Sequence, residues 1–187
     1  TLQVLEDAPA RSYVSRMVAS EKFDKNARID AFFCQISTND GTFDRIERLG
    51  AITPNDVTDL DSFDLSTTAG AIEYIIAYAH QTWDCPVYFY SGSWFGDPDT
   101  GARTHPDPIG SNYSRVVETA KKAAEKWNGI DGCRVGVIDL FNDEAFNALV
   151  SDSDWTYLMK DAVHPRKAGY IVWWLPAFQE FLYGEFA

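Results

Sequence analysis

The segment Asp161-Ala162-Val163-His164 places a carboxylic acid three residues before an imidazole, directly ahead of Pro165. A turn of this length can bring the carboxylate onto one ring nitrogen, where it fixes the tautomer and stabilises the imidazolium formed on proton abstraction. The other ring nitrogen is then free to act as a general base. A structural explanation stays open at this point: His164 could cap the following helix, with Asp161 simply solvated.

A second polar group, Ser37-Thr38-Asn39-Asp40-Gly41, follows the first clear apolar run of the chain. If that run is a strand, Asn39 stands at its carboxyl end and can point its side-chain N–H at a developing oxyanion. Such a donor stabilises a transition state by roughly 3–4 kcal/mol. Asn, Asp and Gly are also ordinary turn formers, so a plain turn explains the same residues.

The other histidines and the most conspicuous serines have simpler explanations. We expect His80 at the end of an apolar helix and His105 in a solvated, proline-rich turn. Ser91 and Ser93 flank Gly92, but the chain contains neither Gly-Asp-Ser nor the Gly-x-Ser-x-Gly of a nucleophile elbow, and we expect both as loop residues. The chain therefore holds a candidate base without a recognisable nucleophile.

The elements that must position these residues alternate along the chain. Apolar runs at 31–36, 87–90 and 134–140 predict strands covered on both faces. Apolar stripes predict helices over 10–20, 67–79, 112–127 and 165–183, the last interrupted at Pro176. This alternation predicts a parallel sheet of right-handed βαβ units. Two long loops, 41–66 and 91–110, leave the carboxyl ends of strands, where open α/β sheets bind ligands.

The composition limits the classes of partner. The 187 residues predict one domain spanning 1–187, and the net charge of −12 argues against binding to nucleic acid or an anionic membrane. No apolar run is long enough to span a membrane. Three widely spaced cysteines favour inert thiols over disulfides and favour the cytoplasm, although the compartment stays open. Asp97-Pro98-Asp99 resembles part of a calcium loop but lacks its later ligands, so we expect no metal site.

Together, the polar segments resemble those of the SGNH hydrolases, the GDSL-type esterases and lipases. Gln35–Asp40 is similar to the Asn block of this family, and Asp161–Tyr170 resembles its Asp-x-x-His block, including Pro165 and the Gly169-Tyr170 pair. The resemblance covers nearly the whole chain. It implies a flavodoxin-like α/β/α sandwich and an ester hydrolase in which His164 is the base, Asp161 its orienting acid and Asn39 an oxyanion donor.

The chain departs from the family pattern in two ways. Ser37 stands where the family usually has Gly, and the blocks that carry the nucleophilic Ser and the oxyanion Gly have no counterpart. We therefore expect a domain whose first strand and nucleophile lie upstream of Thr1, supplied in cis or in trans.

The resemblance implies a small ester as substrate, such as an acetylated carbohydrate or a lipid, and no cofactor. The alternative is a degenerate homologue that binds carbohydrate without hydrolysis, with Tyr90, Trp94 and Phe95 stacking on sugar rings. A flavodoxin-like nucleotide binder is a weaker possibility, because the chain has no Gly-rich phosphate loop.

Overall fold

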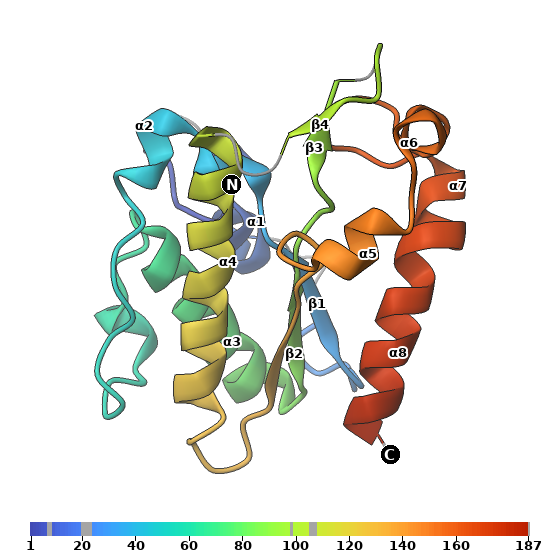
Figure 1. Cartoon of the computed structure of the whole chain (residues 1–187). Helices are drawn as coiled ribbons and strands as arrows, with labels where there is room; N and C mark the ends of the chain where they lie inside the picture. The colour runs from blue at the N-terminus through green and yellow to red at the C-terminus, as the bar shows by residue number, and fades with distance from the viewer. Residues whose placement is uncertain (7–8, 20–23, 98, 105–107, 187) are drawn as a thin grey trace.

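Three short strands form a parallel sheet at the centre of the molecule (Figure 1). The computed structural model describes residues 1–6, 9–19, 24–97, 99–104 and 108–186. In this part of the chain, β1 (Phe32–Gln35) pairs with β2 (Val87–Tyr90), and β2 pairs with β5 (Val135–Ile138). The strand order is β1-β2-β5. Each strand lies within one of the three predicted apolar runs, and the predicted parallel pairing is confirmed.

Helices cover both faces of this sheet. The helices α3 (Thr68–Trp83) and α4 (Pro108–Trp127) lie on one face, and α8 (Leu175–Phe186) lies on the other (Figure 1). The short helix α1 (Tyr13–Ala19) contacts α3. The predicted α/β/α sandwich is therefore confirmed.

The alternation of side chains along β2 builds a separate apolar core on each face. Val87 and Phe89 belong to the larger cluster under α3 and α4. The rings of Tyr88 and Tyr90 point the other way and contact Phe181 and Phe178 of α8, with centroids 5.8 and 5.1 Å apart. A strand buried on both faces is expected to be apolar throughout, and β2 fits this expectation.

β1 does not fit it. In the described residues β1 is an edge strand, paired on one side only, and 42% of Phe33 is exposed. Phe33 lies beside Tyr88 on the α8 face, whereas Phe32 faces the larger core and stacks on Trp83 at 5.8 Å. The prediction that all three strands are covered on both faces was wrong for β1.

Several short elements inside the polar segments had not been predicted. They are α2 (Phe43–Ile46), a hairpin of β3 (Phe95–Gly96) and β4 (Arg103–Thr104), α5 (Glu144–Ala148), α6 (Asp152–Leu158) and a 3₁₀ turn at Leu60–Ser62. Two further 3₁₀ turns lie at Pro9–Arg11, beside the start of the predicted 10–20 helix, and at Thr38–Gly41, where a turn was one of the two explanations of the sequence. The side chains of Asp143 and Ser151 cap α5 and α6 by accepting backbone N–H bonds. Such helices are too short to show a periodic pattern.

The last predicted helix is divided into three parts. A short α7 (Lys167–Gly169) leads into a π-helical turn (Tyr170–Trp174), which continues into α8. The Leu175 N–H bonds to the Tyr170 carbonyl five residues back, one residue before Pro176. Proline cannot donate a backbone hydrogen bond, so a change of helical pitch is the form that the predicted interruption takes here.

A buried ion pair fastens the loop that precedes α3. Lys126 donates to Glu73, Thr53 and the Val57 carbonyl at 2.6–2.7 Å, and the side chains of Lys126 and Glu73 are 3% and 0% exposed. Much of the predicted 41–66 loop is thereby held against α3 and α4.

Among the described helices, none combines the length and the apolar character needed to cross a bilayer.

Candidate functional site

The side chains of His164 and Asp161 form the contact expected from their spacing. Nδ1 of His164 lies 2.8 and 3.0 Å from the two carboxylate oxygens of Asp161. The imidazole is 65% exposed and the carboxylate 45%. Because Asp161 holds Nδ1, the remaining ring nitrogen Nε2 is the one available to exchange a proton with another molecule.

The backbone around this pair is tied into a compact loop, which we call the His164 loop (residues 160–166). The Lys160 N–H donates to the His164 carbonyl at 2.8 Å, and the Arg166 N–H donates to the Leu158 carbonyl at 2.7 Å. The Arg166 side chain also donates to the Met159 carbonyl at 2.8 Å. These bonds hold the ends of the loop together, so that Asp161 and His164 face each other without help from a distant element.

Hydrogen bonds within the loop favour the ionised form of Asp161. Partial burial raises the pKa of its carboxyl. The backbone N–H groups of Val163 and His164, together with the imidazole, lower this pKa by more than burial raises it, so the net shift is downward. The N–H distances to Oδ1 are 3.1 and 2.9 Å. Asp161 is thus present as a carboxylate, the form that can stabilise an imidazolium.

Asn39 lies in the 3₁₀ turn that follows β1, and it is exposed. Its backbone carbonyl accepts bonds from the N–H and hydroxyl of Thr42. Among the described contacts, its side-chain amide takes part in none. The turn formed by these residues was one of the two possibilities left open by the sequence, and it still leaves the amide free to donate to a ligand.

The neighbouring Asp40 is fully buried and shapes this turn. Its carboxylate accepts hydrogen bonds from the Thr1 hydroxyl at 2.5 Å and the Leu2 N–H at 2.8 Å. Thr1 is itself only 6% exposed. The first residues of this chain therefore lie directly against the Asn39 turn.

The Asn39 turn and the His164 loop lie at the same end of the molecule, at the carboxyl ends of the strands (Figure 1). The Tyr113 hydroxyl joins β1 to the β2 exit, since it donates to the Ile36 carbonyl at 2.8 Å and accepts from the Gly92 N–H at 3.2 Å. The Gly96 N–H then donates to the Ala162 carbonyl of the His164 loop at 3.2 Å. In the described residues no hydrogen bond joins Asn39 directly to His164, and the two segments are connected through Tyr113, the segment after β2 and Gly96.

The remaining sequence candidates have structural surroundings. Ser91 and Ser93 are buried loop residues, as expected, and the Ser91 hydroxyl donates to Asp139 at 3.4 Å while accepting from the Phe141 N–H at 2.9 Å. His80 lies near the end of α3, 3.7 Å from Asp84. His105 lies outside the described residues. The described part of the chain contains no cluster of three or more His, Cys, Asp or Glu side chains suited to a metal ion.

The aromatic residues considered for sugar stacking are engaged with other side chains. Phe95 is 8% exposed and packs against the rings of Tyr113 and Phe141. Tyr90 packs on Phe178, and burial raises the pKa of its hydroxyl to about 12. Trp94 donates to the Phe141 carbonyl, and the Arg103 guanidinium lies 5.7 Å from its ring centroid. These contacts explain the aromatic residues by packing.

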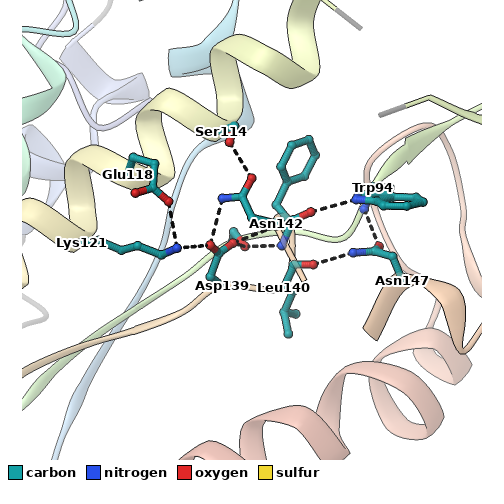
Figure 2. A network of polar contacts seen from close by, with 10 residues as sticks. Trp94, Ser114, Glu118, Lys121, Asp139, Leu140, Asn142 and Asn147 are labelled. Carbon is teal, nitrogen blue, oxygen red and sulfur yellow. Dashed lines mark hydrogen bonds and ion pairs between the residues drawn. The ribbon is translucent and has the colours of Figure 1, made fainter. Parts of the chain in front are cut away.

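Sequence reasoning missed a polar network beside this end of the sheet (Figure 2). Asp139 follows β5 and binds Lys121 of α4 at 2.6 Å, as well as the Asn142 backbone and side chain at 3.0 and 2.9 Å. Asn142 also accepts from Ser114. Only the position of Asp139 at the end of an apolar run could have indicated this network, because its partners come from distant parts of the chain.

The comparisons with known proteins bear on the fold alone. No protein-family model matches the chain, and no curated protein matches it. A solved crystal structure superposes on it with a TM-score of 0.60 and 17% sequence identity, covering 90% of this chain and 68% of that one. At this identity the likeness supports the α/β architecture and says nothing about activity.

Proposed function

We propose that this chain is part of a serine ester hydrolase of the SGNH type. The observation that carries the proposal is the His164–Asp161 pair: Nδ1 lies within 3.0 Å of both carboxylate oxygens, while most of the imidazole is exposed. A histidine oriented by a carboxylate and open to solvent on its other side has the arrangement of a general base. The resemblance of Asp161–Tyr170 to the Asp-x-x-His block of the family supports the same role for His164.

The proposed reaction uses protein groups only. His164 Nε2 removes the proton from a serine hydroxyl, whose oxygen attacks the carbonyl carbon of a small ester. The side-chain amide of Asn39 donates to the oxyanion of the tetrahedral intermediate. The imidazolium, stabilised by Asp161, then gives its proton to the departing alcohol, and water releases the acyl group through the same steps.

The nucleophile in this proposal is a serine on a segment upstream of Thr1. Ser91 and Ser93 are poor candidates, because both are buried and the Ser91 hydroxyl is held by Asp139 and Phe141. Thr1 lies beside Asp40, next to the candidate oxyanion donor. A segment joined to Thr1 would thus enter the molecule beside the site that needs it. The proposed substrates are small esters, including acetylated carbohydrates and lipids.

Hydrolysis of p-nitrophenyl acetate tests the proposal, using the protein expressed from its own start codon. We expect His164→Ala to lower kcat/KM by roughly 10³-fold or more, because the serine loses its base. His80→Ala is the matched control, since it removes an imidazole that also lies near an aspartate but at the end of α3. Equal rates for the wild type and His164→Ala would refute the proposal.

A further inference from the structure

The segment that leaves β2 holds the His164 loop in place. The Gly96 N–H donates to the carbonyl of Ala162, two residues before His164. The indole of Trp155 packs closely over Gly96, and a Cβ at this position would come within 2.7 Å of the ring. Because Trp155 belongs to α6, which leads into the His164 loop, the position of Gly96 is coupled to this loop by a hydrogen bond and by packing.

A buried side-chain amide, that of Asn147, binds the segment that contains Gly96. Asn147 of α5 is fully buried, and its Oδ1 accepts from the Trp94 N–H at 2.9 Å (Figure 2). Its Nδ2 donates to the carbonyls of Leu140 and Asp143 at 2.7 and 2.8 Å. The side chain therefore joins the exit of β2 to the exit of β5, two residues ahead of Gly96.

Arg103 reinforces this junction from the β3–β4 hairpin. Its guanidinium donates to the Asn147 carbonyl at 2.6 Å and to Asp152 of α6 at 3.1 Å. Arg103 thus links the backbone of Asn147 to the helix that precedes the His164 loop. Only 11% of its side chain is exposed, so these bonds are partly shielded from water.

We propose that Asn147 is a positioning residue for His164, acting through Trp94, Gly96 and Ala162. The internal bonds of the His164 loop hold Asp161 against the imidazole, and Asn147 sets where this pair lies relative to the sheet and to the Asn39 turn that follows β1. The catalytic consequence rests on the proposed function, whereas the positioning itself can be measured without any activity.

The test compares two substitutions that each remove an amide bridging two backbone segments. Asn147→Ser removes the junction described above. Asn128→Ser is the control. The Asn128 amide donates to the Val135 carbonyl and accepts from the Val135 N–H, at the end of β5 opposite to the Asn147 junction. The readouts are hydrogen exchange of the Gly96 amide and the NMR signals of the His164 ring, which are assigned by their loss in His164→Gln.

We expect Gly96 exchange at least tenfold faster in Asn147→Ser than in Asn128→Ser, with the His164 ring signals displaced only in the former. Arg103→Lys is a milder variant for the case in which Asn147→Ser does not fold, and it should change both readouts in the same direction. The proposal would be overturned if the Gly96 amide of Asn147→Ser exchanged no faster than that of Asn128→Ser and the His164 ring signals stayed in place.

Kinetics of the complete protein give a second readout. A positioning role predicts that Asn147→Ser lowers kcat about tenfold while KM changes less than twofold, because chemistry and not substrate binding depends on the place of the imidazole. An equal loss of kcat in Asn128→Ser would contradict the role. If the wild type hydrolyses no ester, the proposed function fails, and the exchange experiment still decides the positioning.

Discussion

Asp161 is held by three donors from its own loop, and this sets the sign of a pH effect on stability. Two backbone N–H groups and the imidazole favour its carboxylate form, so its pKa in the folded protein lies below the ordinary value of 3.8. A lowered pKa stabilises the folded state above the unfolded pKa, and this stabilisation is lost as the pH falls through the folded pKa.

We therefore predict that Asp161→Asn destabilises the protein at pH 6 more than at pH 3. The amide side chain keeps an acceptor oxygen but has no charge to lose in acid. Urea denaturation of both proteins at the two pH values measures the difference in the free energy of unfolding. A destabilisation that is the same at both pH values would show that the bonds to Asp161 do not depend on its charge.

The Lys126–Glu73 pair leads to a second prediction at the residue scale. Lys126→Met leaves the Glu73 carboxylate buried without its cation, and we expect a loss of about 3–5 kcal/mol in the free energy of unfolding. Glu73→Gln combined with Lys126→Met removes the uncompensated charge and should recover about half of that loss. Urea denaturation measures both, and a double variant less stable than Lys126→Met would contradict the explanation.

In the described residues β1 and β5 are both edge strands of the parallel sheet, and Phe33 gives β1 an exposed aromatic side chain. The backbone N–H groups of Phe32 and Ile36 donate to the β2 segment. Because N–H groups alternate in direction along a strand, those of Phe33 and Gln35 point to the free edge. An unpaired edge with an exposed aromatic side chain and no charge is a template for association with another strand.

We predict that residues 1–187 self-associate along the β1 edge, and that Phe33→Lys reduces this association and lowers the free energy of unfolding by less than about 1 kcal/mol. The matched control is Phe32→Lys, which places a charge against Trp83 in the larger core and should cost about 3 kcal/mol or more. Sedimentation velocity and urea denaturation measure the two effects. Unchanged self-association in Phe33→Lys would show that the molecules do not associate through the β1 edge.

The elements that the sequence could predict are those set by local pattern. Strand runs, the α3 and α4 stripes and the interruption at Pro176 depend on residues close together in the chain. The Asp161–His164 contact was predictable for the same reason. Asn147 was not, because its main partner Trp94 lies 53 residues away, and only the folded chain brings the two together.

At the scale of the whole molecule, the sandwich brings the candidate groups to one end of a small sheet. The Asn39 turn follows β1, the Asn147 junction joins the exits of β2 and β5, and the His164 loop precedes the helices of the second layer. Each strand exit is tied to the next by a buried hydrogen bond. Asn39 and His164, which are more than 120 residues apart in sequence, thus lie in segments at the same end of the sheet.

The central claim is that His164 activates a serine carried upstream of Thr1. A fluorophosphonate probe tests it most directly, because the probe forms a covalent bond with an activated serine. We predict that the protein expressed from its own start codon is labelled on one serine upstream of Thr1. Labelling should fall at least a hundredfold in His164→Ala and stay unchanged in His80→Ala. Labelling of Ser91 or Ser93, or equal labelling in the wild type and His164→Ala, would contradict the account.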